Sequence, residues 1–191
     1  GGLDNAVANV TGAKVVWHCE WDAAPSKILE KHFPGVPNYR DVSLVDFTQV
    51  EPVDILTGGF PCQPFSQAGQ KKGFSDTRGT LFFNVEEIIR TKRPRAFFLE
   101  NVRGLITHGG PSEIVPGIGK TMETILSHLY GDKKLGGLGY HKPKGTTGFF
   151  YVKASDFGVP QHRPRVFIIG FRDKKDADAF VVPKPEKLDE T

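Results

Sequence analysis

The sequence predicts an α/β fold in which a mainly parallel sheet is flanked by helices. Short apolar segments with the length of strands alternate with longer segments whose apolar residues recur at helical spacing, as in folds of this class. Polar residues suited to chemistry follow several of the predicted strands, and ligands of open α/β sheets bind at those strand ends. Because 191 residues is the size of one domain, we expect a single domain that carries both features.

Each predicted strand is a short apolar run, rich in β-branched or aromatic residues, between turn or charged residues. The first run ends at Glu20 and Trp21, the second leads into a Gly-Gly turn, and the third follows Pro94 and ends at Glu100 and Asn101. The predicted strands are residues 15–19, 53–56, 96–99, 149–153 and 166–171.

Three segments have the apolar spacing of helices: residues 23–33, 81–90 and 120–130. The last carries one apolar face, which we interpret as part of the core, formed by Met122, Ile125, Leu126 and Leu129. Residues 132–148 are rich in Gly and Lys and lack periodicity, so we expect a mobile loop or a connection that packs on a partner.

Composition excludes some classes of protein. With 38% apolar and 25% charged residues, the chain is an ordinary globular protein, and its apolar runs are far shorter than the roughly 20 residues of a membrane-spanning helix. Since there is also no charged-then-apolar leader, we expect no membrane partner. The net charge of +3 is too small to establish nucleic-acid binding. Two cysteines, Cys19 and Cys62, make a poor disulfide scaffold, which favours a reducing, cytoplasmic compartment.

Cys62 is the strongest candidate for chemistry. It lies between Pro61 and Pro64, directly after the glycine turn that ends a predicted strand. Each proline fixes its own φ and restricts the residue before it, so the thiol is held at a defined angle. Such a thiol is suited to attack as the thiolate, and the alternative is a small buried side chain in a Pro-Gly turn.

A second motif is weaker. Residues 117–121 include Gly119, Lys120 and Thr121, an order found in phosphate-binding loops. Such a loop needs a glycine five residues before Gly119, where this chain has Ile114, and no strand leads into it. We therefore expect no nucleotide-phosphate site there.

Three segments, in this order, resemble the motifs of the C5-cytosine DNA methyltransferases of the bacterial restriction-modification type. They are the Pro-Cys-Gln loop at Cys62, the Glu-Asn-Val strand end at residues 100–102 and the Gln-x-Arg-x-Arg segment at residues 161–165. The resemblance spans residues 1 to about 172 and implies a Rossmann-like, S-adenosylmethionine-dependent methyltransferase fold. It also implies an enzyme of the bacterial cytoplasm, associated with the nucleoid, that acts on double-stranded DNA without a metal.

The resemblance assigns the reaction to named side chains. It implies that Cys62 attacks C6 of a cytosine rotated out of the duplex, which activates C5 toward the methyl group. Glu100 would bind N3 and the exocyclic amine, while Arg163 and Arg165 would contact O2 and neighbouring phosphates and favour the thiolate. Further substrate contacts are expected at Ser66, Gln67, Asn101 and Gln161. Asn101 is alternatively a brace for the loop or a turn residue, and residues 66–75 a solvated loop.

The implied cofactor site lies toward the beginning of the chain. Glu20 would bind the ribose hydroxyls of S-adenosylmethionine and Trp21 its adenine, with Asp41 near the adenine amino group and Val42 against the ring. Alternatively, Asp41 is a turn residue or helix cap and Trp21 a core aromatic. Four further positions complete the expected cofactor contacts: Gly1, Gly2, Pro61 and Leu81.

The chain departs from the family pattern at both ends. Gly1 and Gly2 match only the tail of the cofactor's glycine loop, and the target-recognition region and C-terminal motifs are absent. We therefore interpret residues 1–191 as a catalytic domain that is incomplete at the N-terminal glycine loop. Target recognition would come from a missing region or a second subunit.

Two alternative functions remain open at the level of sequence. One is a tRNA cytosine-5 methyltransferase with the same catalytic plan, and the other is a homologue that binds DNA without methylating it. The run from Pro61 to Ser66 favours DNA, and the intact set of Cys62, Glu100, Arg163 and Arg165 favours activity.

Overall fold

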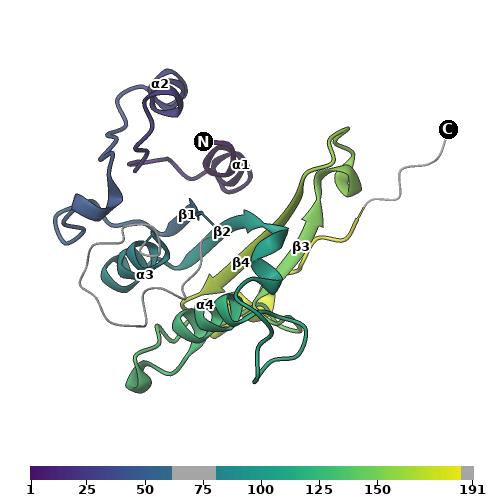
Figure 1. Ribbon diagram of the computed structural model, residues 1–191. Helices are drawn as coiled ribbons and strands as arrows, with labels where there is room; N and C mark the ends of the chain where they lie inside the picture. Colours follow the sequence, from purple (N-terminus) through teal and green to yellow (C-terminus); the bar gives the residue numbers. More distant parts are fainter. Residues whose placement is uncertain (62–80, 186–191) are drawn as a thin grey trace.

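The computed structural model describes residues 1–61 and 81–185 (Figure 1). Within these residues a four-stranded sheet has the strand order β1-β2-β4-β3. Its strands are β1 (Ile55–Gly59), β2 (Ala96–Val102), β3 (Phe149–Lys153) and β4 (Pro164–Phe171). The helices are α1 (Gly2–Thr11), α2 (Ala23–His32), α3 (Leu81–Lys92), α4 (Lys120–Tyr130) and α5 (Lys174–Ala179).

The α/β fold class is confirmed, and the described sheet is mixed rather than mainly parallel. β1 and β2 are parallel, whereas β4 lies antiparallel between β2 and β3. A short connection of residues 154–163 returns the chain from β3 to β4, which permits only the antiparallel pairing. Apolar composition predicts that a segment forms a strand but not the direction in which it pairs.

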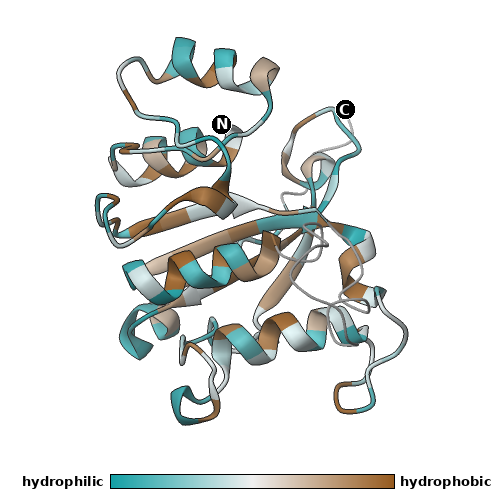
Figure 2. Cartoon of the chain, turned by 60° about the vertical axis from the view of Figure 1, so that its left-hand side comes forward, coloured by the Kyte–Doolittle hydropathy of each residue, from teal (hydrophilic) through white to brown (hydrophobic). Residues whose placement is uncertain are grey.

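The main core lies between the sheet and helices α3 and α4. Leu56, Phe97 and Ile168 face Ile89 and Met122, and all five side chains are buried. α1 contacts the opposite face of the sheet, since Asp4 accepts a hydrogen bond from Thr57 of β1. In Figure 2 the strands are largely hydrophobic, whereas hydrophobic and hydrophilic residues alternate along the helices, as expected of helices with one buried face.

Most predicted elements are confirmed. Helix 120–130 and strand 149–153 coincide with α4 and β3, and helices 23–33 and 81–90 correspond to α2 and α3. Strands 96–99 and 166–171 extend to β2 and β4, and strand 53–56 is shifted to β1. The sequence did not predict α1 and α5.

The predicted strand at residues 15–19 is wrong, because the segment forms only one isolated bridge, His18 to Asn38. The Asn38 side chain explains why the ladder stops. Its Oδ1 accepts hydrogen bonds from the backbone N–H groups of Glu20 and Arg40, so a side chain takes donors that a partner strand would otherwise bind. Arg40 then turns the chain away with a φ of 65°.

Residues 132–148 pack on the core of their own chain. Leu138 and Tyr140 are buried, and the Tyr140 hydroxyl donates a 2.7 Å hydrogen bond to the Pro94 carbonyl. A short 3-10 helix, Lys133–Leu135, lies within this segment. Among the helices that the structure describes, none combines the length and apolar character of a membrane span.

Candidate active site

Two parallel strands bring the predicted catalytic segments to one edge of the sheet. In the β1–β2 pairing, Gly59 lies opposite Glu100, so both strands reach their carboxyl ends together. Phe60 and Pro61 continue from β1 at this edge. Cys62, Ser66 and Gln67 lie outside the described residues.

Asn101 ties β2 to the residues that lead to Cys62. Its Nδ2 donates a buried 2.7 Å hydrogen bond to the Phe60 carbonyl, and its Oδ1 accepts from Val102 N–H at 2.8 Å. The side chain is 5% exposed, so water does not replace these partners. Asn101 therefore acts as a brace, because its side-chain amide binds both the backbone that follows β1 and the backbone at the end of β2.

Glu100 lies beside two arginines. Its Oε1 accepts a 2.9 Å hydrogen bond from Arg165 Nε, and Arg163 Nη2 lies 3.8 Å from the same oxygen. Arg165 is further fixed by its Nη1, which donates to the Pro164 carbonyl at 2.8 Å. The Glu100 carboxylate remains 30% exposed, so it is oriented by the arginine and still open to a ligand.

The β2–β4 register explains why residues far apart in sequence meet here. Glu100 pairs with Phe167 and Val102 pairs with Arg165, so the start of β4 lies against the end of β2. Gln161 precedes this start, and its carbonyl accepts a 3.0 Å hydrogen bond from Arg163 N–H. The Gln161 side chain is exposed and has no hydrogen-bond partner among the described residues.

A second group of predicted residues gathers around Glu20. Glu20 Oε1 accepts a 2.9 Å hydrogen bond from the Asp22 N–H, which fixes the carboxylate. The Trp21 ring next to it is 73% exposed, which excludes the alternative of a core aromatic. An oriented carboxylate beside an open aromatic face suits a ligand that carries both hydroxyls and a flat ring, such as a nucleoside.

Two residues that the sequence analysis missed hold this group together. The Asn38 side chain binds both backbone groups of Glu20. Its Oδ1 accepts from the Glu20 N–H at 2.9 Å, and its Nδ2 donates to the Glu20 carbonyl at 3.1 Å. Arg40 Nη2 donates a 2.9 Å hydrogen bond to the Trp21 carbonyl. No local signal identifies these contacts, because each joins segments about twenty residues apart.

Asp41 and Val42 follow directly in the chain. Asp41 caps the 3-10 helix Val42–Leu44, with Oδ1 accepting from the N–H and the hydroxyl of Ser43. These hydrogen bonds hold the pKa of Asp41 below its usual value. Asp41 thus caps a helix, as one alternative expected, and its place near the adenine stays a prediction, while Val42 is half-buried against the main core.

The other predicted cofactor contacts lie at element boundaries. Gly1 is the residue before α1 and Gly2 its first residue, while Leu81 begins α3 and packs against the main core. Pro61 follows Phe60 at the sheet edge. No hydrogen bond or ion pair joins the Glu20 group to the Glu100 group within the ranges that the structure describes.

The residues present fit the cofactor that the sequence implies. The helix start at Gly1 and Gly2, the fixed Glu20 carboxylate and the exposed Trp21 ring supply the donors, acceptors and apolar surface that a nucleoside needs. No cluster of three or more His, Cys, Asp or Glu side chains able to hold a metal ion occurs in residues 1–61 and 81–185. Fold and site together define the chain as an α/β domain with a candidate nucleoside site.

Comparison with known proteins identifies the family. The family model of the C-5 cytosine-specific DNA methylases matches residues 1–191, and the chain belongs to this family. It is 43% identical over 187 residues to the type II methyltransferase M.HpaII of Haemophilus parainfluenzae, covering 97% of this chain and 47% of the relative. It is 42% identical over 174 residues to M.HaeII of Haemophilus aegyptius, covering 91% of this chain and 48% of the relative.

Solved structures agree with the fold. A crystal structure of an E. coli protein encoded within a prophage and described as a DNA modification methyltransferase has a TM-score of 0.68 and 28% identity, covering 99% of this chain and 49% of that one. The Dnmt2 methyltransferase of S. pombe, at 19% identity and a TM-score of 0.60, shares the fold over 90% of this chain and 47% of its own. The chain thus spans about half the length of the relatives it matches.

Proposed function

We propose that the chain is the catalytic part of a DNA (cytosine-5)-methyltransferase of a bacterial restriction-modification system. The observation that carries this proposal is the Glu100 carboxylate, oriented by Arg165 at the sheet edge where Asn101 holds the segment leading to Cys62. Family membership supports the same reaction. The substrate is double-stranded DNA, and the enzyme works in the cytoplasm, close to the nucleoid.

The proposed division of labour follows from the two groups of residues. Glu20 and Trp21 bind the nucleoside part of S-adenosylmethionine, with Asp41 and Val42 beside the adenine. When bound, this cofactor would supply an electrophilic methyl group and leave as S-adenosylhomocysteine. Further contacts to it come from Gly1, Gly2, Pro61 and Leu81.

The chemistry of the base is carried by the other group. The target cytosine leaves the stack at a cost of a few kcal/mol, because its ring atoms are inaccessible in the duplex. The Cys62 thiolate adds to C6, Glu100 binds N3 and the exocyclic amine, and C5 gains the nucleophilic character it needs. After C5 takes the methyl group, loss of the C5 proton to a base expels Cys62 and restores the ring.

The remaining residues position the DNA and the loop. We assign Arg163 to the O2 of the base and the adjacent phosphates, since its guanidinium is 52% exposed and only 3.8 Å from Glu100. Arg165 orients Glu100, and Asn101 braces Phe60 rather than contacting the base. Ser66, Gln67 and Gln161 would lie around the opening through which the base enters.

Covalent trapping tests this proposal. Duplex DNA made by amplifying a mixed-sequence library with 5-fluorodeoxycytidine triphosphate contains every short recognition site, so the unknown specificity is no obstacle. Fluorine at C5 blocks the elimination step, and we expect a DNA adduct on denaturing electrophoresis that requires S-adenosylmethionine.

Two matched cysteine variants make the test specific. Cys62→Ala should abolish the adduct, whereas Cys19→Ala should retain it. A folded protein that binds S-adenosylmethionine and DNA but forms no adduct would point to a non-catalytic role. Trapping on fluorocytosine-containing tRNA, and not on DNA, would transfer the proposal to the RNA reaction.

A further inference from the structure

Arg103 differs from the other arginines that the structure describes. Each of those donates a hydrogen bond or forms an ion pair within the described residues, to a carboxylate or to a backbone carbonyl. Arg103 has no such partner in residues 1–61 and 81–185. Its guanidinium lies over the ring of Tyr151, with Cζ 5.5 Å from the ring centroid.

The position of Arg103 places it beside the candidate active site. It begins the 3-10 helix Arg103–Thr107 directly after β2, two residues beyond Asn101. Asn101 pairs with Val166 of β4, which in turn pairs with Tyr151 of β3. Asn101, Val166 and Tyr151 therefore lie side by side across three strands. The residue that braces Phe60 is at one end of this row, and the ring that contacts Arg103 is at the other.

The surroundings of Arg103 are basic. Lys153 ends β3 opposite Pro164, and His162 and Arg163 precede β4, so all three lie at the same edge of the sheet. The acidic side chains described at this edge are Glu100, which Arg165 binds, and Asp156. An exposed guanidinium with open donors in such a place has the chemistry of a site for a phosphate.

We propose that Arg103, held by the ring of Tyr151, binds a backbone phosphate of the DNA next to the flipped cytosine. The inference rests on the proposed function, which supplies DNA as the partner. The cation–π contact limits the rotamers of a side chain that is otherwise free, so less conformational freedom is lost when the phosphate binds. The contact is independent of sequence and fixes the register of the duplex on the sheet edge.

Salt-dependent binding of a labelled duplex of arbitrary sequence tests this inference without knowledge of the recognition site. The slope of log Kd against log salt counts the phosphates that the protein neutralises, at about 0.9 per contact. We expect Arg103→Ala to lower this slope by about one contact and to weaken binding about 3- to 10-fold at low salt. Arg103→Lys should retain the slope, because it keeps the charge.

Variants of Tyr151 test whether its ring positions Arg103 for the phosphate. Tyr151→Leu should weaken binding about two- to fivefold with the slope unchanged, and should add nothing when Arg103 is already alanine. Tyr151→Phe should behave as wild type, because the ring is retained. Arg95→Ala is the matched control, since Arg95 is 58% exposed at the opposite edge of the sheet and pairs with Asp176.

An unchanged slope in Arg103→Ala, or a loss no larger than that in Arg95→Ala, would overturn the inference. Loss of thermal stability in Arg103→Ala without any change in slope would do the same, because it would assign the side chain a structural role. Covalent trapping separates this result from a failure of the proposed function. If wild type forms the adduct while Arg103→Ala keeps its slope, only the phosphate contact is refuted.

Discussion

At the scale of single residues, the candidate site depends on side chains that hold other groups in place. Arg165 orients the Glu100 carboxylate, and Asn101 donates to the Phe60 carbonyl. The Asn38 side chain binds the backbone of Glu20. Each holder is an amide or guanidinium, a group with several donors in fixed geometry. Replacing a holder should therefore affect the reaction without removing any group that contacts the base.

We predict that Asn101→Ala destabilises the fold by about 1–3 kcal/mol, because the buried Phe60 carbonyl loses its donor. The rate of adduct formation should fall as well, while S-adenosylmethionine binding is retained. Chemical denaturation and trapping kinetics measure the two effects. Asn84→Ala is the matched control, since the buried Asn84 Nδ2 has no partner among the described residues and its loss should be nearly neutral. Equal effects in both variants would refute the brace.

The second cysteine should be chemically inert near neutral pH. Burial raises the pKa of the Cys19 thiol to about 11, so roughly one molecule in a thousand carries the thiolate at pH 8. In a Cys62→Ala variant, we expect Ellman's reagent to label Cys19 slowly, with a rate that rises about tenfold per pH unit between about pH 7 and 9. Rapid labelling at pH 7 in the folded protein would contradict this assignment. Unfolding in guanidinium should restore the reactivity of a free thiol.

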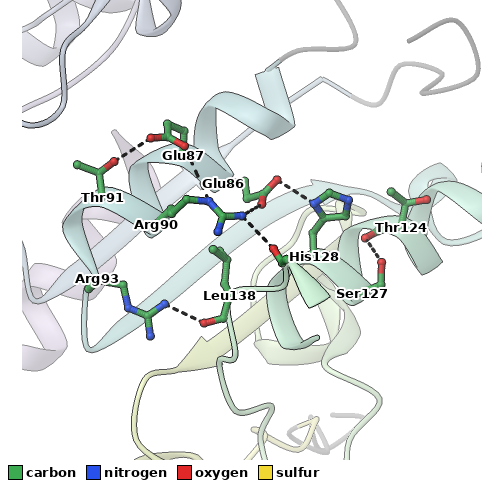
Figure 3. Close-up of polar contacts among 10 residues, drawn as sticks. Glu86, Glu87, Arg90, Thr91, Arg93, Thr124, Ser127, His128 and Leu138 are labelled. Atoms are coloured by element: carbon green, nitrogen blue, oxygen red, sulfur yellow. Dashed lines mark hydrogen bonds and ion pairs between the residues drawn. The ribbon is translucent and has the colours of Figure 1, made fainter. Parts of the chain in front are cut away.

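At the scale of elements, a polar cluster joins the two helices under the sheet (Figure 3). Glu86 of α3 is 8% exposed, and its two oxygens accept from Arg90 on the same helix and from His128 Nδ1 of α4 at 2.9 Å. Arg90 also donates to the Gly136 carbonyl at 3.1 Å, which ties in the segment after α4. The cluster fixes how α3 and α4 lie on the sheet.

Breaking this cluster should weaken the whole domain. Glu86→Ala leaves the donors of Arg90 and His128 without their carboxylate, and we expect a loss of about 1–3 kcal/mol in the free energy of unfolding. Glu87→Ala should stay within about 0.5 kcal/mol, because Glu87 is 62% exposed and lies 3.9 Å from Arg90. Urea denaturation compares the two neighbours directly. If Glu87→Ala proves the more damaging, the cluster does not hold the helices together.

At the scale of the whole molecule, the sheet order determines which distant segments meet. β1 and β2 end at the same edge, and β4 enters the sheet there in the opposite direction. Residues near 60, 100 and 165 are therefore neighbours, although the chain between them forms α3, α4 and β3 (Figure 1). Arg103 lies at this edge too, without a hydrogen-bond partner among the described residues, so the topology that builds the candidate site also places the proposed phosphate contact.

The sequence predicted much of this arrangement because several features are local. Apolar spacing predicted α4 from its buried Met122, Ile125 and Leu129, and the order of motifs predicted the family before any geometry was known. The wrong strand at residues 15–19 shows the limit of such patterns. Its residues have strand propensity, but only His18 forms a bridge, and the Asn38 side chain binds the N–H groups of Glu20 and Arg40 that would have continued the pairing beyond it.

By itself, the sequence determined the class of fold, the family and the candidate chemical groups, because burial patterns and motif residues are written into short segments. Only the tertiary structure decided that β4 pairs antiparallel with β2, that Arg40 donates to the Trp21 carbonyl, and that the Arg103 guanidinium lies over the Tyr151 ring. These features depend on which distant segments become neighbours. Pairing of that kind is set by the packing of the whole domain, and no local pattern encodes it.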